Sequence, residues 1–326
     1  MVKDASWKEY LSDNERYADL INGLGCKGRQ VIGKADLQET DTQTGIFAGL
    51  EFVRKLPQKA GKRNIKIRDA VRKAAFGMNF AVIRIESQET MDYELPLRNL
   101  SYDVGEYEKQ ATGIRREVRR SSENLTSGEY LYGFKKDSRL YPVVTFILYT
   151  GMFWDGPECL HDMLDFTDIP KELRELAPDY RINLIKIREF EDTHMFRTDV
   201  KQVFDFIRCS ENKTALKELV EKDAYYKEME EDAFDVAARY ANADKLVKVK
   251  NYHRKGETID MCTAIEELIA EGRAEGRANG VDEERRKIIA NMLRAGIPDN
   301  EIRMLAECDQ GIIDAVRKAD GRYIYG

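Results

Sequence analysis

The sequence lacks the features of a membrane protein, a disulfide-bonded protein or a zinc protein. No apolar run approaches the roughly 20 residues that a membrane-spanning helix requires, and residues 1–20 contain no apolar core of a signal peptide. The five cysteines are scattered without a C-x-x-C pair, and the three histidines have no neighbours at ligand spacing. These absences predict a cytoplasmic protein with no membrane partner, and they argue against a disulfide framework and a zinc site.

Charge is abundant but unevenly distributed. The 326 residues carry a net charge of −6, which by itself does not indicate a nucleic-acid partner. Residues 54–73 nevertheless contain nine bases and a single acid, Asp69, and a second basic group follows at 115–120, whereas 211–239 is acidic. A local basic surface of this kind is what phosphate binding requires, although a charged loop without a ligand would give the same pattern.

Hydrophobic periodicity predicts an α/β region followed by helices. Residues 6–25 have helical spacing, and residues 65–71 and 80–88 are expected to form an antiparallel hairpin. A helix over 95–118 follows, then a buried central strand over 141–151 and another strand over 181–187. The pattern becomes helical after Thr198. We therefore predict one domain at 1–210 and a helical tail at 211–326.

The tail contains glycine at every fourth position of a helical pattern. Gly272, Gly276 and Gly280 lie in the passage EGRAEGRANG. Glycines at this spacing form a smooth stripe along which a second helix can approach closely. We predict an oligomerisation helix at 258–280, with a low-complexity linker as the alternative. Residues 282–320 are expected to form a small helical packing module.

The segment AVIRIESQET, 81–90, begins as an apolar strand and ends in polar residues. Glu86 and Gln88 point to one face of a strand, and Asp69 on the preceding strand can face them across the hairpin. Two carboxylates and an amide oxygen suit a hard divalent cation such as Mg²⁺. Solvated strand ends are the alternative explanation for these residues.

Several ordered blocks of sequence resemble one protein family. They are RDAVRK, IESQE, MDYELPLRNLSYDVGEYEKQ, LYGFKKDSRLYPVVTFILYTGMFWDGP and APDYRINLI, and the tail segment IDMCTAIEELIAEGRAEGR fits as well. Together they resemble the recombination-promoting nuclease and putative transposase family, a branch of the PD-(D/E)XK nucleases. The resemblance covers roughly residues 10–210 and part of the tail.

The resemblance implies a fold, a cofactor and residue roles. The fold would be a restriction-endonuclease-like mixed sheet flanked by helices, here followed by an all-helical tail. Asp69 and Glu86 would bind Mg²⁺ or another divalent cation, and Asp19 on the first helix, with Glu15 as second choice, would complete the site. Gln88 replaces the lysine of the wider superfamily, so a nearby Lys or Arg would have to supply the charge. We expect DNA phosphates to contact the basic residues Lys62, Arg63, Lys66, Arg68, Arg72, Lys73 and Arg98.

The function expected from these observations is metal-dependent endonucleolytic cleavage of DNA, linked to recombination or mobile elements. Two alternatives stay open. A nuclease-like fold that no longer cuts would be a DNA-binding or partner-binding module, because fold does not fix function. A transposase that joins as well as cuts strands is the other.

Overall fold

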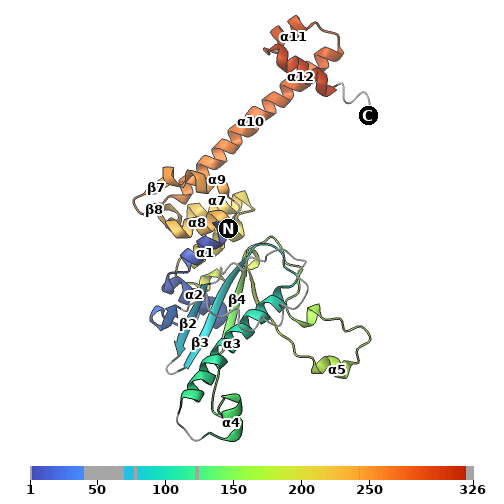
Figure 1. Cartoon of the computed structure of the whole chain (residues 1–326). Coiled ribbons are helices and arrows are strands. Elements are labelled where there is room, and N and C mark those ends of the chain that lie inside the picture. The colour runs from blue at the N-terminus through green and yellow to red at the C-terminus, as the bar shows by residue number, and fades with distance from the viewer. Residues whose placement is uncertain (1, 40–69, 77–78, 122–124, 242, 321–326) are drawn as a thin grey trace. The chain divides into compact units, whose positions relative to one another are not determined.

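A computed structural model of the chain describes residues 2–39, 70–76, 79–121, 125–241 and 243–320 (Figure 1). The chain divides into two compact units, Met1–Cys262 and Thr263–Gly326. The division lies well after the boundary predicted at residue 210. Residues beyond 210 join the first unit because α8 (Glu231–Tyr240) buries its apolar face there and packs against α1 (Val2–Tyr10).

A five-stranded mixed sheet forms the centre of the first unit. Its order is β1 (Leu37–Glu39), β2 (Ala70–Phe76), β3 (Asn79–Gln88), β4 (Val143–Tyr149) and β5 (Asn183–Lys186). The pairings β1–β2 and β2–β3 are antiparallel, whereas β3–β4 and β4–β5 are parallel. The predicted hairpin and the interior position of β4 are therefore confirmed. The described part of β2 runs to Phe76, beyond the predicted end at 71.

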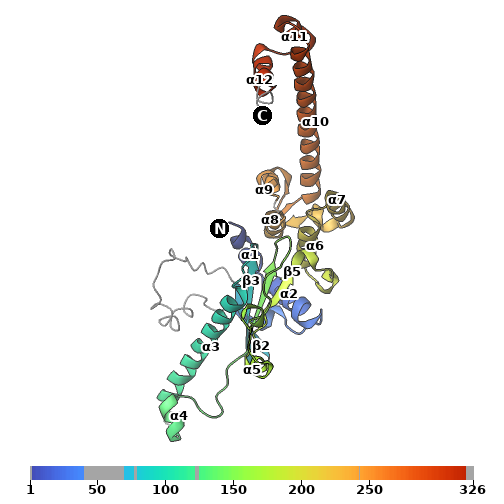
Figure 2. The same cartoon turned by 90° about the vertical axis from the view of Figure 1, so that its right-hand side faces the viewer.

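Helices cover both faces of this sheet (Figure 2). On one face α3 (Leu95–Arg120) begins at Leu95, which packs in a core with Ile147, Tyr149 and Trp154. On the other face lies α2 (Asn14–Cys26), where an added Cβ at Gly25 would stand 3.1 Å from the Phe146 ring. Because neighbouring residues of a strand point to opposite faces, Phe146 and Ile147 divide β4 between the two helices.

The rest of the first unit is largely helical. It contains α4 (Ser127–Tyr132), α5 (Lys171–Leu176), α6 (Val200–Cys209), α7 (Lys213–Lys222) and α9 (Asp244–Val249). Rings of Trp7 and Tyr240, whose centroids lie 5.7 Å apart, join α1 to α8. This contact ties the N-terminus to a segment that the sequence assigned to the tail.

The sequence predicted an all-helical region after residue 210, and this prediction is wrong because the region also contains three short strands. Strands β6 (Met229–Glu230), β8 (Thr258–Ile259) and β7 (Arg254–Lys255) form a small antiparallel sheet in that order. Lys255 pairs with Thr258 across a tight turn in which Gly256 has φ +67°. Glycine accepts this left-handed conformation without steric cost. Strands this short carry too little periodicity to be recognised in the sequence.

The second unit consists of most of α10 (Met261–Arg294), together with α11 (Asp299–Leu305) and α12 (Gln310–Asp320). Ile289, Ile302, Ile313 and Val316 form a small apolar core among these three helices. The predicted helical module is therefore present, but α10 continues through residue 281 and joins the two predicted segments. Added Cβ atoms at Gly272, Gly276 and Gly280 would meet no described atom within 4 Å, so no described residue covers the stripe.

The part of the chain that the structure describes contains no helix that is both long and apolar enough to cross a membrane.

Candidate active site

Glu86 and Gln88 lie at the end of β3 and face α3. Arg98, in the first turns of α3, donates from one guanidinium nitrogen to Glu86 Oε1 at 2.7 Å and to Gln88 Oε1 at 3.0 Å. Its other terminal nitrogen pairs with Asp92. The sequence placed Arg98 among the DNA contacts, whereas the structure makes it the ionic partner of the candidate metal ligand. Arg98 remains partly accessible, with 29% of its side chain exposed.

The amide of Gln88 is held at both ends. Its Nε2 donates to the Thr90 carbonyl at 2.6 Å, and its Oε1 accepts from Arg98. This arrangement fixes the amide orientation and directs its oxygen toward the guanidinium. Gln88 therefore positions Arg98, a role that sequence spacing alone did not indicate.

Glu86 is a buried carboxyl group with only one of its oxygens engaged. Its side chain is 12% exposed, and Oε2 has no hydrogen-bond partner among the described residues. Burial raises the pKa of Glu86, and the positive charges of Arg98 and Arg84 oppose that shift. A buried oxygen without a partner is costly unless something binds it. An oxygen of this kind is suited to bind a cation, which would take the place of the missing hydrogen-bond donor.

A polar layer beneath the site holds α3 on the sheet. Asp103 accepts from the Thr145 hydroxyl at 2.8 Å and from the Tyr180 hydroxyl at 2.6 Å. Arg84 lies 3.7 Å from the same carboxylate and stacks over the Tyr102 ring. The sequence analysis did not select Arg84, although it is two residues before Glu86 and therefore points to the same face of β3 as Glu86 and Gln88. The layer keeps the start of α3, and hence Arg98, next to Glu86.

Five of the predicted site residues lie outside the described residues: Asp69, Lys62, Arg63, Lys66 and Arg68. The first described residue of β2, Ala70, pairs with Ile85, the residue that precedes Glu86. Among the residues that the structure does describe, no group of three or more His, Cys, Asp or Glu side chains could hold a metal ion. Glu86 is thus the one described carboxylate of the predicted pair.

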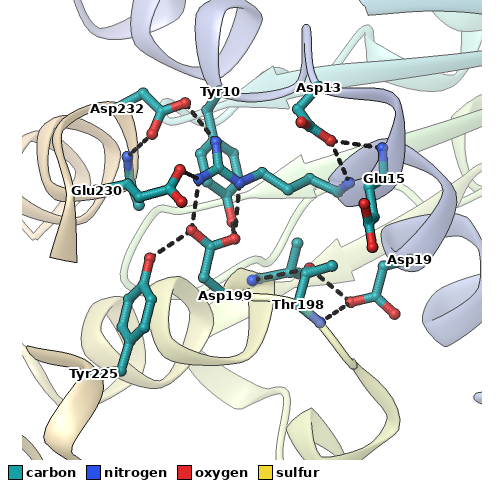
Figure 3. A network of polar contacts seen from close by, with 12 residues as sticks. Tyr10, Asp13, Glu15, Asp19, Thr198, Asp199, Tyr225, Glu230 and Asp232 are labelled. Carbon is teal, nitrogen blue, oxygen red and sulfur yellow. Dashed lines mark hydrogen bonds and ion pairs between the residues drawn. The ribbon is translucent and has the colours of Figure 1, made fainter. Parts of the chain in front are cut away.

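Asp19 does not join Glu86, and its carboxylate instead accepts from Thr198 (Figure 3). It lies on α2, on the opposite face of the sheet from α3, and its Oδ2 accepts from the Arg197 and Thr198 amides at 2.8 and 2.7 Å. The Thr198 hydroxyl donates to the same oxygen at 2.7 Å. Asp19 therefore orders the segment before α6. The second choice, Glu15, is exposed and pairs with Lys34 at 3.0 Å.

Arg16, one turn before Asp19, is the buried centre of an ionic network whose acidic partners Asp199, Glu230 and Asp232 are labelled in Figure 3. Its guanidinium makes two bonds of 2.8 Å to the Asp199 carboxylate, in the paired geometry that arginine favours. It also pairs with Glu230 and Asp232, which lie at the start of α8. The network ties α2 to α6 and α8 across the first unit.

Two tyrosines complete this network. Tyr10 and Tyr225 donate to the Asp199 oxygens at 2.9 and 2.7 Å, and the Arg16 guanidinium lies over the Tyr10 ring. Burial, followed by the negative charge of Asp199, raises the pKa of both tyrosines. No sequence pattern indicated this cluster, because its members lie far apart along the chain.

Arg72 is not the DNA contact that the sequence predicted. It is buried, donates to Asn14 Oδ1 at 3.2 Å, and lies over the Tyr17 ring. Lys73, the next residue, is half-buried and opposite Val82 in the β2–β3 register. Of the predicted basic contacts, Arg98 alone adjoins Glu86 among the described residues.

Comparisons with known protein families, with curated proteins and with solved structures found no match for this chain.

Proposed function

We propose that this chain is a cytoplasmic, metal-dependent endonuclease that hydrolyses phosphodiester bonds in DNA. The observation that carries the proposal is the unpartnered, buried Oε2 of Glu86 beside Arg98 and Gln88. A mixed sheet with helices on both faces is compatible with a restriction-endonuclease-like fold, and the ordered sequence blocks of the nuclease family support the same assignment. The link to recombination or mobile elements rests on that resemblance.

Asp69 and Glu86 would hold Mg²⁺ or another divalent cation. When bound, such an ion lowers the pKa of its water and polarises the phosphoryl oxygen. Glu86 serves this role in its ionised form, which Arg98 and Arg84 favour against burial. Oε1 would stay on Arg98 while Oε2 is directed to the ion.

Arg98 supplies the positive charge that Gln88 cannot carry. In the wider superfamily a lysine stands at the position of Gln88, and the amide has neither its charge nor its proton. Here the amide oxygen of Gln88 holds the guanidinium, and 29% of the Arg98 side chain stays accessible to the scissile phosphate. Arginine suits phosphate because its planar fork of donors matches the oxygens.

The test is nicking of supercoiled plasmid by the purified full-length protein. We expect relaxed plasmid with Mg²⁺ or Mn²⁺ and intact plasmid when EDTA is present. Intact plasmid with every divalent cation, alongside measurable DNA binding, would instead identify a nuclease-like binding module. Joined rather than cut products would identify a transposase.

Self-association of the second unit is a separate part of the proposal. The glycine stripe of α10 is bare and exposed, and the like-charged pair Arg273 and Arg277 can find acidic partners on another helix. We expect a homo-oligomer that forms along this stripe.

Gly276→Leu should weaken self-association without harming the chain, because no described atom lies where the added Cβ would stand. Leucine also favours a helix over glycine by up to about 1 kcal/mol. Sedimentation velocity at micromolar concentration checks this, with Ala274→Leu, exposed but off the stripe, as the matched control. A full-length wild-type protein that sediments as a monomer would contradict the expectation.

A further inference from the structure

The C-terminal end of α3, together with α4 and the segment after it, forms an arm at residues 113–121 and 125–139. Figures 1 and 2 show α4 beside the far end of α3, away from the helix start that carries Arg98. At 1.5 Å per residue, Arg98 and Arg120 stand about 33 Å apart along this helix. The arm is therefore distinct from the candidate active site but within the same unit.

The arm is held firmly in place. Thr126 and Glu129 form a reciprocal capping box at the start of α4. Gly133 ends α4 in a left-handed conformation and lies against Arg115 of α3. Beyond the arm, Gln110 bonds both the Tyr141 amide, at 2.7 Å, and the Tyr141 carbonyl, at 3.2 Å. These contacts order the start and end of α4 and link the segment to α3.

Three consecutive large side chains on α4 are exposed. Tyr130 is 78% exposed, Leu131 69% and Tyr132 70%. Nothing in the described chain covers them, although the helix that carries them is capped and anchored. Successive residues of a helix are turned by about 100°, so these side chains point in different directions from α4. Large exposed apolar groups on one element mark an interaction surface.

The arm that carries these tyrosines is basic. The described residues of the arm carry seven bases and three acids. Arg116, Arg119 and Arg120 are exposed and form no ion pair with other described residues. Of the acids, Glu129 is engaged by the Thr126 hydroxyl at 2.8 Å and by the Lys136 amide at 3.1 Å. The surface therefore favours an anionic partner.

We infer that this arm binds single-stranded DNA, with bases stacked on Tyr130 and Tyr132 and phosphates on Arg116, Arg119 and Arg120. Exposed aromatic rings beside a basic surface are the chemistry by which proteins hold unpaired bases. This inference rests on DNA being the substrate of the proposed function. The distance of about 33 Å equals about 10 base pairs of duplex, so one DNA molecule can reach both the arm and the candidate site.

The test is fluorescence anisotropy of labelled oligothymidylate and of a duplex of equal length, with full-length protein in EDTA. Tyr130→Ala and Tyr132→Ala should each weaken single-strand binding by about 10-fold, and duplex binding much less. Combined Arg116→Ala, Arg119→Ala and Arg120→Ala should reduce the salt dependence, by about 0.7 in log–log slope for each lost contact. Tyr252→Ala, an 84% exposed tyrosine outside the arm, is the matched control.

Several outcomes would overturn the inference. The inference is wrong if both tyrosine variants bind single-stranded DNA with unchanged affinity. It is also wrong if their loss of affinity is no larger than the loss caused by Tyr252→Ala. Variants that alter sedimentation but not DNA affinity would assign the arm to self-association. Because binding is measured without metal, it stands apart from cleavage: a protein that never nicks plasmid can still bind through the arm, and an arm that fails leaves plasmid nicking intact.

Discussion

Replacing Glu86 by glutamine is expected to reduce metal-dependent nicking by more than about 100-fold. Even groups that only support metal ligands typically change activity by 10- to 100-fold, and Glu86 would be a ligand itself. The wild-type rate should also fall as the pH is lowered, because burial raises the pKa of Glu86 and only its ionised form suits the ion. Plasmid nicking rates across a pH series measure both effects, and Asp69→Ala should reproduce the loss.

The matched control is Glu89→Gln, an exposed carboxylate one residue beyond the end of β3. It removes the same charge from the same strand end, but from an exposed side chain rather than a buried one. Equal losses in Glu86→Gln and Glu89→Gln would show a general charge effect and would count against Glu86 as a metal ligand. If Glu86→Gln nicks plasmid at the wild-type rate, Glu86 is not a metal ligand and the proposed active site is wrong.

Replacing Arg16 by methionine is expected to lower the free energy of unfolding of the first unit by about 3–5 kcal/mol. Arg16 and Asp199 are each only 8% exposed, so the change leaves a carboxylate buried without its cation. It also cuts the contacts of α2 with Glu230 and Asp232 at the start of α8. Urea denaturation followed by tryptophan fluorescence reports this unit, because Trp7 and Trp154 both lie within it.

Lys34→Met is the control for this prediction. Its ion pair with Glu15 has side chains that are 68% and 62% exposed, and such surface pairs contribute at most about 1 kcal/mol. Combining Arg16→Met with Asp199→Asn should recover part of the loss, because the unpaired charge is removed as well. If Arg16→Met and Lys34→Met lowered the free energy of unfolding by similar amounts, the network around Arg16 would contribute no more than a surface ion pair.

Local patterns predicted the elements on which the candidate site is built. Alternation in 80–88 and the apolar run at 141–151 were sufficient for β3 and β4, and helical spacing was sufficient for α3. Such patterns are readable because strand and helix periods depend on near neighbours in the chain. Same-face spacing likewise placed Glu86 and Gln88 together.

Contacts between side chains that lie far apart in the sequence could not be predicted from local patterns. Arg72 and Arg98 are both basic residues near the predicted site, yet one is buried on Tyr17 and the other is bound to Glu86. Asp19 was expected to complete the site because it lies on the first predicted helix, yet its carboxylate bonds the segment before α6. Sequence gives the charge of each side chain, whereas its partner depends on which faces meet.

Sequence patterns were sufficient for β3, β4 and α3, for the alternation that gives Glu86 and Gln88 one face, and for the fourfold spacing of the glycines in α10. Tertiary structure alone decided that residues 211–262 belong to the first unit, that Arg16 joins three helices, and that Arg98 closes on Glu86. Periodicity is a local property of the chain, so the sequence displays it directly. Burial and ionic pairing instead depend on contacts between residues far apart in sequence, which exist only once the sheet and its helices have assembled.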